Sequence, residues 1–355
     1  MADYDQIRFG ILGCAKIARK VARAINLAPN SLLYALASRS LEKANTFAAA
    51  NGLSETLKIY GSYDQLLDDP CVDVVYLPLP TTLHVHWAVL AARKKKHLLL
   101  EKPTALDAAE LDRILDACES NGVQFMDGSM WLHHPRTAKM KEMLFDSGLF
   151  GHLHLIHSTS TSMGMPEFFE NDIRVKPELD AHGALGDLGW YCIGATLWAK
   201  NYQLPTSVTA LPDTTKNSDG VILSCTASLH YDQPEITTTI IHCSFLSYTC
   251  TDLSISASKG SLHLQDFIIP FQEDSAFFNF YIGWNVKPEK IVVKCNLPQE
   301  ALMVQELAKI VEGIKKSGCR PESKWPEISR KTQLVLDAVK QSVDFGCKPV
   351  YLTQH

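Results

Sequence analysis

The stretch Ile7-Arg8-Phe9-Gly10-Ile11-Leu12-Gly13-Cys14-Ala15-Lys16-Ile17-Ala18 decides the fold of this chain. Its first half predicts a buried strand, and the residues after it have apolar side chains four apart, which predicts a helix. A loop of small residues between a strand and a helix is the dinucleotide-binding fingerprint, in which three glycines make the turn, admit the pyrophosphate and allow close packing. Gly13 fills the first glycine position. Ala15 in the second departs from the motif and predicts looser contact with the phosphates.

Up to Gly128, short apolar runs alternate with helical patterns, which is typical of successive βαβ units and a parallel sheet. The predicted strands are residues 7–12, 32–37, 72–77, 98–100 and 123–126. The predicted helices run through residues 17–25, 41–50, 63–67 and 88–92. We therefore predict an α/β fold that begins with a doubly wound Rossmann domain for dinucleotide binding over residues 1–128.

After residue 128 the pattern changes to longer strands with alternating polarity. A helix over 135–146 precedes predicted strands at 152–161, 221–229, 237–245, 252–258 and 261–269, and amphipathic helices follow at 304–314 and 326–343. Alternation of apolar residues with serine and threonine predicts a mostly antiparallel, open-faced sheet. Residues 129–355 are thus predicted to form an α+β domain for substrate binding and oligomerisation, whose terminal helices could pack back on the first domain. The hydroxyl-rich face is either solvated or a subunit interface.

The end of the second strand indicates which dinucleotide binds. An acidic residue there would hold the ribose hydroxyls of NAD, and this chain has Ser38 and Arg39, with Lys43 one helical turn later. A guanidinium and a hydroxyl suit a 2′-phosphate, so NADP is preferred over NAD. The alternative is that Arg39 is an ordinary surface arginine.

Two further segments lie where strands end at the carboxyl edge of the predicted sheet, the usual ligand-binding edge. Pro78, Leu79 and Thr81 lead into a helix on the expected nicotinamide side, and His84 is predicted to form hydrogen bonds at that helix entry rather than to act as a catalyst. Glu101-Lys102-Pro103 follows an apolar run. Lys102 is either a functional cation or half of a solvated charge pair.

In the second half, Asp187 and Tyr191 are four residues apart, which on a helix places a carboxylate and a phenol on one face. The alternative is a helix cap and a core tyrosine.

The fingerprint, Glu101-Lys102-Pro103 and residues 183–191, in this order, resemble the glucose-fructose oxidoreductase, inositol dehydrogenase and rhizopine catabolism family over nearly the whole chain. Tyr191, where many members carry histidine, is similar to the branch with dimeric dihydrodiol dehydrogenase and NADP-dependent D-xylose 1-dehydrogenase. The resemblance implies an NADP-dependent dehydrogenase or reductase acting on CH–OH groups, with Lys102 and Tyr191 as the catalytic pair, Asp187 as an orienting residue, and dimerisation through the second sheet. It also implies that Glu101 orients Lys102 and that Pro103 braces the turn, with a cis peptide as in relatives.

An ammonium about 4 Å from a phenol stabilises the phenolate by up to about 4 kcal/mol at an effective dielectric of about 20, so Tyr191 can exchange a proton with a hydroxyl or carbonyl oxygen. Asp180-Ala181-His182-Gly183 and Trp131-Leu132-His133-His134-Pro135 depart from the family pattern, so sugars cannot simply be assumed as substrates. The predicted substrate-binding residues are Trp131, His133, Arg174 and His182. Arg174 could equally form a structural ion pair. The predicted cofactor-binding residues are Gly13, Cys14, Ala15, Lys16, Ile17, Ser38, Arg39, Lys43, Pro78, Leu79, Thr81, His84, Glu101 and Lys102.

Composition narrows the remaining possibilities. The 355 residues carry a net charge of -5, and the basic residues are dispersed, so we expect neither nucleic acid nor membrane as a partner. Ten scattered cysteines and the absence of a signal-peptide pattern predict free thiols and a cytoplasmic location, and no zinc spacing predicts a metal. The leading prediction is hydride transfer to or from a secondary alcohol or carbonyl of a sugar, polyol, cyclic diol or related metabolite. The alternatives are an epimerase or glycoside-cleaving enzyme with transient redox chemistry, and a non-catalytic dinucleotide-binding regulator.

Overall fold

The computed structural model describes residues 6–233, 235–283 and 286–353. They form two compact units that interleave along the chain. The first unit contains the chain up to Ala105, Ala109–His133 and Leu297–Ser329, and the second contains Leu106–Ala108, His134–Asn296 and the chain from Arg330 onward. Within the described residues, no helix combines the length and the apolar character needed to cross a bilayer.

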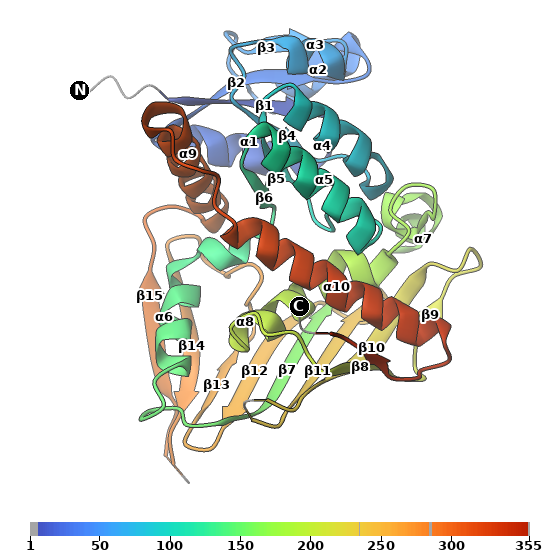
Figure 1. The fold of residues 1–355 in the computed structure, drawn as a ribbon, viewed down its shortest axis with the longest axis vertical. Helices are drawn as coiled ribbons and strands as arrows, with labels where there is room; N and C mark the ends of the chain where they lie inside the picture. Colours follow the sequence, from blue (N-terminus) through green and yellow to red (C-terminus); the bar gives the residue numbers. More distant parts are fainter. Residues whose placement is uncertain (1–5, 234, 284–285, 354–355) are drawn as a thin grey trace. The chain divides into compact units, whose positions relative to one another are not determined.

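The first unit is built on a six-stranded parallel sheet with the strand order β3-β2-β1-β4-β5-β6 (Figure 1). Its strands are β1 Ile7–Leu12, β2 Ser31–Ala37, β3 Lys58–Tyr60, β4 Val74–Leu77, β5 His97–Leu100 and β6 Phe125–Asp127. The predicted Rossmann sheet is confirmed. The prediction missed β3, whose three residues are too few to show a period.

Helices cover both faces of this sheet. They are α1 Ala18–Leu27, α2 Leu41–Ala50, α3 Tyr63–Asp68, α4 His84–Arg93, α5 Ala108–Asn121 and α9 Gln299–Ser317, with short turns at Thr81–Leu83 and Met130–His133. Side chains of α3, α4 and α5 join one continuous core with Leu77, Leu98 and Leu100 of the sheet. Helices α1 and α9 pack against each other, and both also contact β1. With helices on both faces of the sheet, its strands are buried on both sides and must be apolar throughout. The continuous apolar runs in the sequence correspond to these strands.

The second unit contains a ten-stranded sheet in the order β15-β14-β13-β12-β7-β11-β10-β8-β16, with β9 beside β10. Among the described strands of this second sheet, only β7 and β11 pair in parallel. The strands are β7 Leu153–Thr161, β8 Ser207–Ala210, β9 Thr215–Lys216, β10 Ile222–Tyr231, β11 Thr237–Ser244, β12 Cys250–Ala257, β13 Ser261–Leu264, β14 Ser275–Tyr281, β15 Glu289–Lys294 and β16 Val350–Tyr351. The mostly antiparallel sheet is confirmed, although β13 ends five residues before the predicted boundary.

Period-two alternation holds along the central strands. On β12, Leu253 and Ile255 are fully buried while Ser254 and Ser256 are half-buried. Leu223 and Ala257, which the alternation places on the same face as the buried Cys225 and Ile255, are only half-buried because they lie near strand ends. The sheet therefore has one core face and one polar face.

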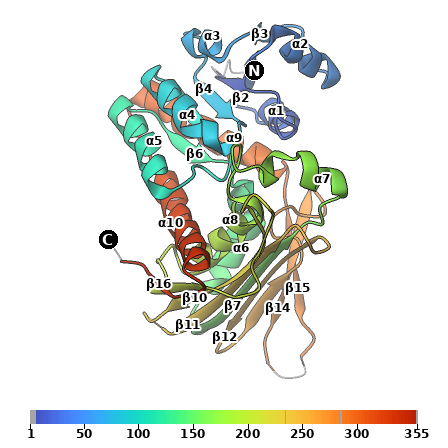
Figure 2. The same cartoon turned by 90° about the vertical axis from the view of Figure 1, so that its right-hand side faces the viewer.

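The helices of the second unit lie on the core face. They are α6 Pro135–Leu144, α7 Pro166–Asn171, α8 Trp190–Ala199 and the part of α10 Lys324–Asp344 that begins at Arg330. Figure 2 shows α8 along the sheet, where it packs against β7 and β11. Helix α10 begins two residues before Pro326, because proline is tolerated in the first turn of a helix.

Candidate active site

The loop after β1 is tied to the end of β2. The amide of Gly13 donates to the carbonyl of Ala37 at 2.9 Å, and Gly13 has a φ of +122°, a conformation that only glycine adopts readily. A Cβ atom at this position would lie 2.9 Å from Cδ2 of Leu79, so the turn has no room for a side chain. These features match the first glycine of a dinucleotide loop.

The loop remains open to solvent at the start of α1. Ala15 accepts a hydrogen bond from the amide of Ala18 at 3.0 Å, and Lys16 and Ile17 are exposed. Ile17 caps α1 without any side-chain hydrogen bond to the helix. Amide groups at a helix start are suited to a pyrophosphate, so this loop fits a dinucleotide.

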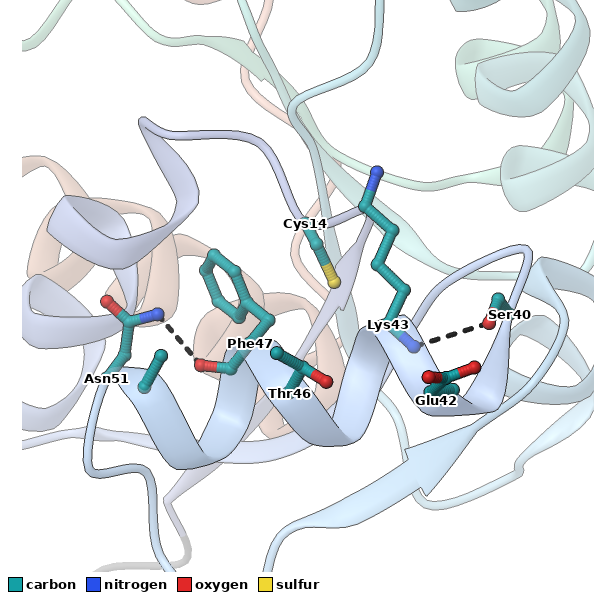
Figure 3. A pocket seen from close by; sticks show the side chains of 8 residues that line it. Cys14, Ser40, Glu42, Lys43, Thr46, Phe47 and Asn51 are labelled. Atoms are coloured by element: carbon teal, nitrogen blue, oxygen red, sulfur yellow. Dashed lines mark hydrogen bonds between the residues drawn. The ribbon is translucent and has the colours of Figure 1, made fainter.

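A cavity of about 400 Å³ opens between this loop and α2 (Figure 3). Its lining residues are Cys14, Ser40, Glu42, Lys43, Thr46, Phe47, Ala50 and Asn51. Ser40 begins α2 by accepting a hydrogen bond from the Lys43 amide at 3.3 Å, which places the lysine side chain on the cavity side of the first turn. Sequence reasoning missed Glu42, a carboxylate that lines the same cavity as Lys43.

Ser38 and Lys43 both influence the pKa of the Cys14 thiol. Burial raises the pKa of the Cys14 thiol, while a hydrogen bond with Ser38 and the charge of Lys43 lower it. The Ser38 side chain is buried and Arg39 is exposed. The charge of Arg39 lowers the pKa of Tyr63, against a larger rise from burial. The predicted 2′-phosphate residues therefore gather beside the Gly13 loop.

Glu101 is held by β4 and by the turn that carries it. Its Oε1 accepts a hydrogen bond from the hydroxyl of Tyr76 at 2.5 Å, and its Oε2 accepts one from the amide of Lys102 at 3.2 Å. Burial raises the pKa of Glu101, and the Tyr76 bond and the Lys102 charge lower it. The peptide between Lys102 and Pro103 is cis. Glu101 therefore stands beside a half-buried lysine at the end of β5.

The segment after β4 is equally buried. Pro78, Leu79 and Thr81 are buried, and both ring nitrogens of His84 face backbone carbonyl oxygens. The predicted hydrogen-bonding role of His84 at the helix entry agrees with these contacts.

In the second unit, Arg174 holds Asp187. The guanidinium Nε lies 3.0 Å from Oδ2 of Asp187, and Nη1 lies 3.0 Å from Oδ1 of Asp172. The nearby Asp187 carboxylate is the main cause that raises the pKa of Arg174, already a strong base. Of the two roles left open for Arg174, the structure shows the ion pair.

The segment that carries Asp187 is not the simple α-helix that the spacing predicted. Leu185–Gly189 forms a π-helical turn that continues directly into α8, which begins at Trp190. Gly183 precedes it with a φ of +59°, and a Cβ there would lie 2.1 Å from the carbonyl oxygen of Ile222. Single π turns inside helices recur at functional sites. Tyr191 follows in the first turn of α8, with 8% of its surface exposed.

Three of the four predicted substrate residues are buried, namely Trp131, His133 and His182. The ring of His133 stacks on Trp325, and its Nδ1 lies 2.8 Å from Oε2 of Glu306, all within the first unit. Neither Glu306 nor Tyr76 could be found from the sequence, because their partners lie 173 and 25 residues away. Lys102 belongs to the first unit, and Asp187 and Tyr191 belong to the second, so their pairing stays a prediction.

Comparison with known proteins gives consistent matches. A family model described as an oxidoreductase family with an NAD-binding Rossmann fold matches residues 7–129, and the GFO/IDH/MocA C-terminal domain matches residues 137–263. The chain is 35% identical over 189 residues to D-xylose 1-dehydrogenase (NADP(+)) 2 of Haloferax volcanii, covering 53% of this chain and 55% of that protein. It is 28% identical to trans-1,2-dihydrobenzene-1,2-diol dehydrogenase of Bos taurus over 73% of this chain and 74% of that one.

Among solved structures, a variant of the 3-ketoreductase KijD10 from Actinomadura kijaniata, in complex with TDP-benzene and NADP, superposes with a TM-score of 0.80. The two proteins are 25% identical, and the match covers 95% of this chain and 98% of the ketoreductase. In sequence, the chain spans about half the length of most curated relatives that it matches. The two family models follow the order of the two units, and the chain belongs to the GFO/IDH/MocA family of oxidoreductases.

Proposed function

We propose that this protein is an NADP-dependent oxidoreductase acting on a secondary alcohol or carbonyl of a sugar, polyol, cyclic diol or related metabolite. The observation that carries the proposal is the pocket beside the Gly13 loop, where Lys43 lines a cavity and no carboxylate stands between Ala37 and Ser40. Relatives named for sugars, for a dihydrodiol and for NADP support the same reading.

The Gly13 loop and the start of α1 would hold the pyrophosphate. Ser38, Arg39 and Lys43 would hold the 2′-phosphate, since a hydroxyl, a guanidinium and an ammonium all donate hydrogen bonds to it. Glu42 lines the same cavity as Lys43, so its carboxylate weakens the attraction for a phosphate there, and Arg39 next to Ser38 is the second cation near the end of β2. A dinucleotide held by these residues would supply hydride transfer to or from the substrate carbon.

The protein would supply the proton transfer. During oxidation, the Tyr191 oxygen takes the proton of the substrate hydroxyl while the carbon gives up hydride, and the reverse occurs in reduction. The Lys102 ammonium stabilises the negative charge that develops on the substrate oxygen. Asp187, held by Arg174, orients a substrate hydroxyl. This assignment pairs a lysine of one unit with a tyrosine of the other, and it rests on the family resemblance.

The polar face of the second sheet is proposed as a dimer interface. Ser228, Ile240, His157, Ser254 and His263 stand in register across five strands of that face. Light scattering coupled to gel filtration should find twice the monomer mass, and Ile240→Glu should return the protein to monomers. A monomeric wild-type protein contradicts the dimer. All ten cysteines are free thiols, which supports a cytoplasmic location.

The function is tested with aldoses including D-xylose, with myo-inositol, with trans-1,2-dihydrobenzene-1,2-diol and with dicarbonyls, each with NADP(H) and NAD(H), by absorbance of the reduced cofactor. We expect turnover with at least one compound and a clear preference for NADP. Lys102→Ala and Tyr191→Phe should each lower turnover by about two to four orders of magnitude with the fold intact.

Tyr248→Phe is the matched control, because Tyr248 is 85% exposed in the second unit. Near-normal rates of the Lys102 and Tyr191 variants would overturn the mechanism. Tighter binding of NAD than of NADP would overturn the cofactor assignment. Binding of NADP without net turnover of the free cofactor would favour transient redox chemistry or a regulator.

A further inference from the structure

His84 connects two loops of the first unit through its imidazole ring. It is the first residue of α4, and 1% of its surface is exposed. Its Nε2 lies 2.8 Å from the carbonyl oxygen of Leu79, and its Nδ1 lies 3.1 Å from the carbonyl oxygen of Thr104. One buried side chain thus contacts two backbone segments that are 25 residues apart in the chain.

Both segments leave the sheet at the same edge. Leu79 follows β4 and Thr104 follows β5, and these neighbouring parallel strands end in register at Leu77 and Leu100. The two loops therefore begin side by side. Lys102 stands only two residues before Thr104, on the far side of the cis peptide to Pro103.

The His84 ring is the hydrogen-bond donor available to the carbonyl oxygens of Leu79 and Thr104 in these contacts. A carbonyl oxygen only accepts hydrogen bonds, and a neutral imidazole has one N–H group whereas an imidazolium has two. Burial lowers the pKa of His84, against the opposite effect of the Leu79, Thr104 and Pro103 carbonyls, so the ring is predominantly neutral at neutral pH. In the neutral ring one nitrogen donates to its carbonyl, and the other nitrogen faces the second carbonyl oxygen without a hydrogen bond, so the two carbonyls compete for a single N–H. Leu79 and Thr104 are themselves buried, so neither carbonyl has ready access to water in its place.

We propose that His84 is a positioning residue that holds the turn carrying Lys102 against the loop after β4 and thereby sets where the Lys102 ammonium stands for the reaction. The assignment of a catalytic task to Lys102 rests on the proposed function. A shift of about 1 Å in a reacting group lowers rates by as much as about 100-fold, so a small movement at Thr104 is enough to matter.

The test compares His84→Phe, which keeps a planar ring and removes both nitrogens, with His84→Gln, which restores an N–H donor. His86→Phe is the matched control, because His86 is exposed on the same helix and its ring contacts only the edge of Trp87 among the described aromatic pairs. Each variant is assayed for kcat and KM with the most active compound of the substrate panel, for NADPH affinity by cofactor fluorescence, and for hydrogen exchange of residues 78–84 and 101–106.

We expect His84→Phe to lower kcat about 10- to 100-fold with the substrate KM changed less than about threefold. Exchange should become faster in both segments together, and His84→Gln should recover at least part of kcat. His86→Phe should match the wild type in every measurement. The loss should also depend on Lys102, so that adding His84→Phe to Lys102→Ala lowers the single-turnover rate by less than about threefold further.

Normal kcat in a folded His84→Phe overturns the proposal, and so does a loss that is fully additive with Lys102→Ala. If His84→Phe does not fold, His84→Gln decides, because a normal kcat together with unchanged exchange in both segments would contradict the brace. Failure of the proposed function can be told apart from failure of the His84 role. It would appear as full activity of Lys102→Ala or as no turnover with any compound of the panel. In the latter case, the exchange of the two segments with and without NADPH decides whether His84 joins them.

Discussion

Arg174 and Asp187 form an ion pair of 3.0 Å between Nε and Oδ2, and the same guanidinium reaches Asp172. Asp172 also accepts a hydrogen bond from the Arg174 amide at 3.0 Å, which fixes the short turn Ile173–Val175. Arg174 therefore faces Asp187 from a local structure that does not depend on the ion pair. The side chain of Asp187 is 18% exposed, so its charge is only partly screened by water.

Arg174→Gln should lower kcat/KM about 5- to 50-fold, because Asp187 loses the cation that orients it. Arg174→Lys should retain more activity, because it keeps a positive charge near Asp187. Arg113→Gln, an exposed arginine on α5, is the control. An unchanged kcat/KM in a folded Arg174→Gln would show that Arg174 has only a structural role.

Gly13→Ala should destabilise the protein by about 1–3 kcal/mol and weaken NADPH binding at least tenfold, because the new Cβ meets Leu79 in a strained backbone. Gly122→Ala isolates the strain alone, since Gly122 has a φ of +66° and no atom within 4 Å of an added Cβ. It should lower the melting temperature and leave NADPH affinity unchanged. Melting curves and fluorescence titrations measure both, and tight NADPH binding by Gly13→Ala would contradict the assigned loop.

Tyr76→Phe should destabilise the protein by about 1–3 kcal/mol at neutral pH, because it leaves a buried carboxylate oxygen of Glu101 without its donor. Burial already raises the pKa of Glu101, and loss of the tyrosine bond raises it further. A raised carboxyl pKa means that the folded state holds more protons than the unfolded state, so stability falls as pH rises above the unfolded value near 4.5.

The destabilisation by Tyr76→Phe should therefore grow between pH 4.5 and pH 7.5, as measured by urea unfolding. In the Glu101→Gln background this growth should disappear. A constant difference at every pH would show that the hydroxyl contributes packing alone.

Two buried histidines should destabilise the protein in acid. Nδ1 of His97 accepts a hydrogen bond from the Gln124 amide at 2.8 Å, and Nδ1 of His134 accepts one from the Arg136 amide at 2.9 Å. Burial lowers the pKa of each from 6.5 to about 4. The unfolded state binds more protons between these values, so stability should fall as pH drops from 6.5 to 4, by about 1–3 kcal/mol for each histidine.

His134→Asn keeps a side chain that can cap α6 and should reduce the loss of stability between pH 6.5 and pH 4. His154→Asn, at an exposed position of β7, is the control and should leave that loss unchanged. His97 lies in the first unit and His134 in the second, so His97→Gln and His134→Asn report on each unit separately. Equal acid sensitivity in all variants would contradict the neutral, accepting state of both rings.

Local patterns in the sequence were sufficient to predict most elements. The six-residue apolar strand β1, the Gly13 loop and the period-two strands β10 and β12 each carry their signal within about ten residues. The short strands β3, β9 and β16 carry too few residues to show a period. The π-helical turn at Leu185–Gly189 was missed because a spacing of four residues is also compatible with an α-helix.

By itself, the sequence determined the two kinds of sheet, the nucleotide loop and the residue types available for chemistry, because backbone preference and burial period act over a few neighbouring residues. The tertiary structure decided which side chains meet. Tyr76 reaches Glu101 because β4 and β5 are adjacent in the sheet, and His84 joins Leu79 to Thr104 for the same reason. Such partners depend on strand order, which is set by the packing of the whole unit and leaves no local pattern in the chain.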